Sequence, residues 1–319
     1  MNAAARERRV APAADIAPLA WDGASMWANQ SWRFAAHDGL LAEADALVRW
    51  ANDQRDPVAE MSHDNVPTPF VDELAQQIHA ELTRGSGVAL VRGFADLPEQ
   101  ALRLLYLKMG LALGDTIDVY GRLYDVRDTG VSYQKAAVPI SLTREATGIH
   151  TDSSAKGVLP RWISLACIRQ AEEGGTSRLI SAAWVHETLR DKSPDLLAVL
   201  YQDFIRDIVT PGGQRDIEKV AANRFPIFSE NQGFCFRYMR FWIERGHARC
   251  GEILSDEALA ALDALDAAMT APEAALTFRM QPGDLLWMDN TTLAHDRDAY
   301  RDAPNQGRLM VRMWLTPKS

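Results

Sequence analysis

The stretch GIHTDSSAKG, residues 148 to 157, places a histidine and an aspartate one residue apart in a chain that has only seven histidines among 319 residues. In an extended segment, side chains two positions apart emerge on the same face. The imidazole of His150 and the carboxylate of Asp152 can therefore reach one point, as a nitrogen and an oxygen ligand on one side of a metal ion. Taken alone, such a pair is more often a surface pair or a capping group than a metal site.

A third ligand has to come from another part of the chain. Five histidines lie in predicted helices or, for the last of them, in a predicted charged loop: His37, His63, His79, His186 and His247. His295 remains, and it follows a predicted strand and turn in PGDLLWMDNTTLAHDRDAY, residues 282 to 300. Two histidines and one carboxylate on a shared face, with positions left open, are typical of non-heme Fe(II) oxygenases.

Two further motifs follow in order. EEGGTSRLIS, residues 172 to 181, sets Thr176 and Ser177 directly after two glycines, and RLMVR sets Arg308 and Arg312 four residues apart after His295. A hydroxyl residue after Gly-Gly more often stabilises a turn than binds a ligand, and an arginine on a strand is more often exposed than buried. These two arginines, however, have apolar neighbours and share one strand face, so on an inward face they would need an anionic partner.

The two parts of the chain have different sequence patterns. From about residue 40 to 112, apolar residues recur every three or four positions, which predicts helices around one short strand, GVALVRGF (87–94). After about residue 130, short β-branched or aromatic runs such as GFCFRYMRFWI (233–243) alternate with turn residues, which predicts strands. We expect a mostly β fold with flanking helices. Residues 21–319 would form one domain after a loosely ordered arm, residues 1–20.

Composition limits the function classes. The net charge of −9 argues against a nucleic-acid partner, and no apolar run reaches the length of a membrane span. The first twenty residues lack the apolar core of a secretory signal. Three cysteines without CxxC spacing suggest neither disulfides nor a cysteine zinc site, so we expect a reducing, cytoplasmic location. A homo-oligomer is compatible with the sequence.

The chain resembles a known family in its motifs and their order. These motifs are HTD, GG followed by a hydroxyl residue, GD…DN…HDR and RxxxR. The chain is similar to the Fe(II)/2-oxoglutarate-dependent oxygenases of the taurine dioxygenase and clavaminate synthase-like superfamily, over roughly residues 85 to 316. The resemblance implies a double-stranded β-helix (jelly-roll) core. It also implies a dioxygenase that uses Fe(II), 2-oxoglutarate and O2.

The resemblance implies a role for each matching residue. The implied iron ligands are His150, Asp152 and His295. Arg308 matches the arginine that holds the distal carboxylate of 2-oxoglutarate, helped by a hydroxyl that falls on Ser177 or Thr176. A guanidinium group suits this task because it forms two parallel hydrogen bonds with a carboxylate.

The primary substrate is predicted less sharply. Arg312 matches a position that binds an acidic group of the substrate in several members, and DVYGRLYDVRD (118–128) carries Tyr120 and Tyr124, which could line a pocket. Hydroxylation of a free amino acid or amino-acid-derived intermediate is the first hypothesis, and sulfonates or aryloxyalkanoates are the second. Desaturation, cyclisation or stereoinversion would use the same residues, whereas Asp152 disfavours halogenation. A non-catalytic jelly-roll that binds a small acid, or a zinc hydrolase or isomerase, are the rival interpretations.

Overall fold

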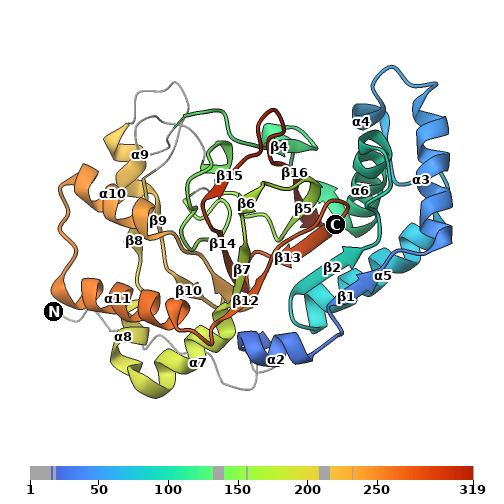
Figure 1. Ribbon diagram of the computed structural model, residues 1–319. Coiled ribbons are helices and arrows are strands. Elements are labelled where there is room, and N and C mark those ends of the chain that lie inside the picture. Colours follow the sequence, from blue (N-terminus) through green and yellow to red (C-terminus); the bar gives the residue numbers. More distant parts are fainter. Residues whose placement is uncertain are drawn as a thin grey trace.

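The computed structural model describes residues 16, 19–131, 140–155, 157–207, 216–231 and 233–318. The predicted N-terminal arm therefore falls outside the described residues except at positions 16, 19 and 20. Two β-sheets lie in the middle of the molecule, with one group of helices outside each of them (Figure 1). This layered arrangement brings the predicted site residues to the space between the sheets.

The front of the chain is helical, as predicted. Its helices are α2 (Gly23–Ala28), α3 (Asp38–Ala51), α4 (Pro57–Glu60), α5 (Pro69–Arg84) and α6 (Glu99–Leu113). Helix α5 ends at Gly85, whose N–H donates to the Glu81 carbonyl, and α6 ends at Gly114 in the same way. The apolar stripes of α3, α5 and α6 pack into one buried cluster on the outer face of the larger sheet.

The larger sheet has seven strands in the order β1-β2-β13-β5-β16-β3, with β4 also paired to β16. Their bounds are β1 Arg33–Ala35, β2 Val88–Arg92, β3 Gly114–Thr116, β4 Tyr124–Val126, β5 Trp162–Arg169, β13 Leu285–Asp289 and β16 Leu309–Pro317. Only β1 and β2 run parallel; the other pairs are antiparallel. Strand β16, which begins directly after Arg308 and carries Arg312, lies inside this sheet between β5 and β3.

The smaller sheet consists of β12 (Ala275–Phe278), β7 (Ser177–Ser181) and β14 (Leu293–Arg297). Alternate residues of each strand face different clusters: Leu179 and Leu293 meet Met310 of the larger sheet, whereas Ile180 and Ala294 face the helices behind. Those helices are α7 (Ala182–Lys192), α8 (Pro194–Val199) and α11 (Asp256–Thr270). Ser255 caps α11 by accepting a hydrogen bond from the Ala258 N–H. This period of two is what allows both faces of a sheet to be buried.

The prediction of a mostly β chain is wrong in its proportions, because the fold is mixed α/β. The remaining elements are β6 (Glu173–Gly174), β8 (Phe204–Ile205), α9 (Ile217–Ala222), β9 (Arg224–Phe225), β10 (Phe228–Ser229), β11 (Cys235–Phe236), α10 (Arg240–Cys250), β15 (Tyr300–Arg301) and the 3₁₀ turns Asp118–Tyr120 and Ile140–Leu142. Within the described residues, none of the helices combines the length and apolar character needed to cross a membrane.

GFCFRYMRFWI shows why the helix content was underestimated. The run was predicted as a strand, but only Cys235–Phe236 is extended, and α10 begins at Arg240. The helix has an Arg240–Glu244 ion pair one turn apart and ends at Gly251 with φ of 66°. His247 therefore lies in this helix and not in a loop. These helix signals outweigh the β-propensity of the aromatic residues.

Candidate active site

His150 and His295 are paired through their main chains. The His150 N–H donates to the His295 carbonyl at 3.0 Å, and the His295 N–H donates back at 2.9 Å. This bridge extends β14 sideways to the HTD segment and sets the two imidazole rings 4.3 Å apart, centroid to centroid. Asp152 completes the group, with Oδ1 at 3.6 Å from His150 Nε2 and 3.8 Å from His295 Nε2.

The donor atoms of these three residues fit a metal ion. One ligand atom from each lies within 4.8 Å of the others. His150 Nδ1 is 2.8 Å from the Gly148 carbonyl, which can only accept, so Nδ1 carries a proton and Nε2 is the nitrogen that faces the site. Burial, together with the neighbouring His150, lowers the pKa of His295 to about 3, which keeps the His295 imidazole neutral.

Asp152 is held in its ionised form. Burial by itself would raise the pKa of this carboxyl group, but Arg312 and the two imidazoles outweigh burial and hold the pKa well below its usual range. Arg312 Nη1 lies 3.2 Å from Oδ2, and Trp314 Nε1 donates to the same oxygen at 2.6 Å. Trp314 was not predicted as a site residue. Its position two residues after Arg312 on β16, and hence on the same face, was the available signal.

The predicted substrate residues gather beside Arg312. Its guanidinium carbon lies 5.0 Å from the Tyr124 ring centroid and 4.5 Å from that of Trp314. Tyr120 approaches both rings, at 5.4 Å from Tyr124 and 5.5 Å from Trp314 between centroids. The structure thus brings one cation and three aromatic rings together next to Asp152, and those rings favour a cation held over their faces.

Arg308 lies in different surroundings. Only 4% of its surface is exposed, and its Nε donates to Gln170 Oε1 at 3.2 Å, while the guanidinium carbon lies 5.2 Å from the Tyr300 ring centroid. A Cβ added at Gly175 would lie 3.4 Å from Arg308 Nε and 3.1 Å from Gln170 Oε1. Gly175, with φ of 69°, thus permits the close approach of the GGTS segment to this arginine.

Ser177 and Thr176 follow that glycine. Ser177 is buried at the start of β7, where it pairs with Arg297 of β14, and Thr176 is half-buried. Both hydroxyl residues thus follow directly after the glycine that approaches Arg308. Arg297 was not predicted; its guanidinium carbon lies 4.6 Å from the Tyr300 ring centroid, and its Nη2 donates to the carbonyls of Thr143 and Glu145.

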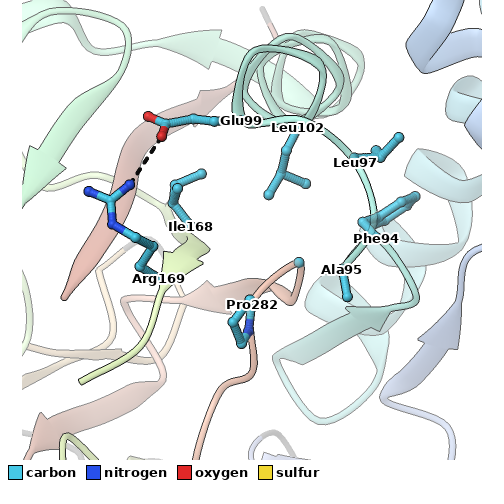
Figure 2. A pocket seen from close by; sticks show the side chains of 9 residues that line it. Phe94, Ala95, Leu97, Glu99, Leu102, Ile168, Arg169 and Pro282 are labelled. Atoms are coloured by element: carbon cyan, nitrogen blue, oxygen red, sulfur yellow. Dashed lines mark hydrogen bonds and ion pairs between the residues drawn. The ribbon is translucent and has the colours of Figure 1, made fainter. Parts of the chain in front are cut away.

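A cavity of about 210 Å³ lies elsewhere, against the start of α6, the end of β5 and the turn before β13 (Figure 2). Polar and apolar atoms contribute about equally to its walls, and Glu99 forms an ion pair with Arg169 at 3.2 Å there. None of the nine predicted site residues lines this cavity. It is therefore separate from the group formed by the two histidines and Asp152.

Comparisons with known proteins agree with this geometry. The sequence model of the taurine catabolism dioxygenase TauD, TfdA family matches residues 54–314. FR-33289 synthase of Streptomyces rubellomurinus is 26% identical over 310 residues, which covers 92% of this chain and 88% of that protein.

Solved structures share the fold. The non-heme iron oxygenase OrfP superposes with a TM-score of 0.68 at 15% identity, covering 89% of this chain and 93% of OrfP. Asparagine oxygenase superposes with a TM-score of 0.65 at 16% identity, covering 90% and 94% of the two chains. With the family model spanning most of its length, this chain belongs to the taurine catabolism dioxygenase TauD, TfdA family and is an Fe(II)- and 2-oxoglutarate-dependent dioxygenase.

Proposed function

We propose that this protein hydroxylates an unactivated C–H bond of a small acidic substrate, a free amino acid or a compound derived from one, with iron held by His150, Asp152 and His295. The observation that carries the proposal is the convergence of two imidazole nitrogens and one carboxylate oxygen within 4.8 Å. This donor set suits Fe(II) and leaves coordination positions open. Iron and 2-oxoglutarate, when bound, supply the oxidant made from O2.

Arg308 is the proposed anchor for 2-oxoglutarate. It is a buried cation whose Nε donates to a neutral acceptor, Gln170 Oε1, and a buried guanidinium is stabilised by a carboxylate that pairs with it directly. The distal carboxylate of 2-oxoglutarate would supply that anion in a two-point contact. A hydroxyl from Ser177 or Thr176 would donate to the same carboxylate, because Gly175 brings this segment against Arg308.

Arg312, Tyr120 and Tyr124 are the proposed substrate contacts. Arg312 uses Nη1 for Asp152 and has further N–H groups that could bind an acidic group of the substrate. The rings of Tyr120 and Tyr124 would exclude water and restrict the orientation of the substrate. Their part is to aim one C–H bond at the metal, since positioning is what the protein itself contributes.

The ranking of substrates comes from similar proteins. OrfP was solved with (3S)-hydroxy-L-Arg and, separately, with Fe and alpha-ketoglutaric acid, and asparagine oxygenase was solved with Fe(II), 3-hydroxyasparagine and succinate. These likenesses put free amino acids first. Sulfonates and aryloxyalkanoates come second, because Arg312 would bind any of these anions.

We also infer that the two facing sheets form the double-stranded β-helix of the family within one domain, residues 21–319. Support comes from the buried cluster shared by β13, β5 and β16 on one side and β7, β12 and β14 on the other. The family match over residues 54–314 spans both sheets.

The test is a screen of amino acids, sulfonates and aryloxyalkanoates with Fe(II), 2-oxoglutarate and O2. We expect one class to trigger succinate formation and O2 consumption together, with Asp152→Ala as the inactive control. Tight binding of a small acid by metal-free protein, with no succinate from any candidate, would overturn the proposal in favour of a binding protein. Turnover of sulfonates alone would replace amino acids by sulfonates as the substrate class, and the proposed roles of the residues would stand.

A further inference from the structure

The two carboxylate oxygens of Asp152 have different neighbours. Oδ1 faces the imidazoles, at 3.6 Å from His150 Nε2 and 3.8 Å from His295 Nε2. Oδ2 points away from them and accepts hydrogen bonds from Trp314 Nε1 at 2.6 Å and Arg312 Nη1 at 3.2 Å. One oxygen is thus available to a metal ion, and the other is already occupied by two donors.

The main chain of Asp152 is fixed at the same time. Its N–H donates to Asn290 Oδ1 at 2.8 Å, and Asn290 Nδ2 donates back to the Asp152 carbonyl at 3.1 Å and to the Pro160 carbonyl at 3.0 Å. With its main chain held by Asn290, the carboxylate retains mainly rotation about its own side-chain bonds. The donors at Oδ2 restrict that rotation.

We propose that Trp314 is a positioning residue whose indole N–H holds Oδ2, so that Asp152 binds the metal through Oδ1 alone. The proposal rests on the proposed function of the three ligands. A carboxylate can bind a metal through one oxygen or through both. Two-point binding would fill a position that the cosubstrate, O2 or both require, so holding Oδ2 would keep the three remaining positions open.

Trp314 is better suited to this task than Arg312. Its ring is planar, carries a single donor and is held between Tyr120 and Arg312, while its strand pairs with Ile163 of β5. Arg312 has several donors on a flexible stem and can turn one of them toward a substrate. The fixed indole N–H of Trp314 and a movable guanidinium N–H of Arg312 therefore donate to the same oxygen, Asp152 Oδ2.

Trp314→Phe tests the proposal, because phenylalanine keeps an aromatic ring and removes the N–H. The matched control is Trp287→Phe on β13, a buried tryptophan whose Nε1 has no hydrogen-bond partner among the described residues. Folding of both variants is checked by melting curves. The readouts are the anaerobic absorption spectrum with Co(II) and the affinity for 2-oxoglutarate, measured from its charge-transfer band with Fe(II).

In Trp314→Phe we expect a changed Co(II) spectrum, which reports coordination number, and a dissociation constant for 2-oxoglutarate raised roughly tenfold. Trp287→Phe should match the wild type in both. A Trp314→Phe protein that is indistinguishable from the wild type would overturn the proposal. Trp314→His, which keeps a ring N–H, should recover part of the loss if the donor is what matters.

A measurement on the unmodified protein does not depend on any variant folding. The infrared difference spectrum between Zn(II)-loaded and metal-free protein reports the splitting of the carboxylate stretching bands, which is wide for one-point and narrow for two-point binding. We expect wide splitting, and narrow splitting would overturn the proposal. If Asp152→Ala gives the wild-type difference spectrum, the metal lies elsewhere and the proposed function of the three ligands fails instead.

Discussion

Arg308 and Arg312 lie four residues apart at one strand, yet their surroundings are opposite. Arg312 already has an anion from the chain, Asp152 at 3.2 Å, and is covered by aromatic rings. Arg308 bonds Gln170 and faces Tyr300, with a second buried cation, Arg297, near the same ring. Two arginines, one directly before β16 and one on it, are thus distinguished by what the rest of the fold places around them.

The electrostatics of the two regions differ accordingly. Burial lowers the pKa of Arg308, and burial together with Arg308 lowers the pKa of Arg297 to about 10. Two buried guanidinium groups, each with its protonated form disfavoured by burial, create a preference for an incoming anion. Among the described residues, the side chain of Arg308 bonds a neutral amide and that of Arg312 bonds a carboxylate, so Arg308 is the one expected to bind 2-oxoglutarate. The first three predictions each perturb one side of this comparison.

The largest effect is expected from Asp152→Ala, which removes the partner of Arg312 and leaves Arg308 unchanged. Substrate-dependent succinate formation should be abolished, because one of three metal ligands is lost. The measurement is succinate release in chloride-free buffer, with melting curves to show that the fold survives. Full activity in this variant would show that Asp152 is not a metal ligand.

Arg312→Ala should separate the two arginines. Loss of a contact to a buried carboxylate costs about 2–5 kcal/mol, so product formation should fall by roughly 30-fold or more. The Fe(II)·2-oxoglutarate charge-transfer band should remain, because Arg308 and Trp314 are intact. Loss of that band would show that the two roles are assigned the wrong way round.

Arg308→Lys keeps the charge and removes the two-point geometry. Charged hydrogen bonds contribute about 1.5–3 kcal/mol, so the apparent constant for 2-oxoglutarate should rise by roughly tenfold or more, and the constant for the primary substrate should change less. Steady-state titrations of each ligand test this. An unchanged constant for 2-oxoglutarate would move its binding site to another residue.

The smallest effect on the site is expected from His186, which lies behind the smaller sheet on α7 and bonds Tyr201 through Nε2 at 2.9 Å. Burial, and secondarily Arg190, lowers its pKa from 6.5 to about 4. Because the folded protein binds this proton less readily than the unfolded chain, stability is full above pH 6.5 and falls as the pH drops toward 4. The loss should reach about 2 kcal/mol by pH 5.

Denaturant titrations between pH 7 and pH 4.5 measure this slope, with His186→Gln as the comparison. The free energy of unfolding of His186→Gln should change less between pH 7 and pH 4.5 than that of the wild type. The variant should bind 2-oxoglutarate like the wild type at pH 7. The same slope in both proteins would assign the acid sensitivity to other groups.

Local sequence patterns predicted those site residues whose type is rare in the chain or unexpected in its surroundings. His150, Asp152 and His295 were found because they are rare donors at short or suitable spacing, and the structure brings them to one point. Arg308 and Arg312 were found because charges interrupt an apolar strand. Helices α3, α5 and α6 were found from their apolar period.

Trp314 and Arg297 were missed because a tryptophan in an apolar strand and an arginine beside an aspartate look ordinary. Their importance comes from partners that are distant in the sequence: Asp152 for Trp314, and Thr143 and Glu145 for Arg297. The available signal was the alternation of strand faces: Trp314 lies two residues after Arg312, and Arg297 two residues after His295. The strand predicted over α10 failed because aromatic residues serve strands and helix surfaces alike.

The main-chain bridge between His150 and His295 sets the order in which this protein can acquire its metal. Nearly half of the chain separates the two residues, so a large loop must close before both imidazoles meet. A growing chain carries His150 and Asp152 long before β14 is synthesised. Both imidazoles are therefore in place only once β14 has joined the fold, and a metal ion that binds the folded chain alone would stabilise it by mass action.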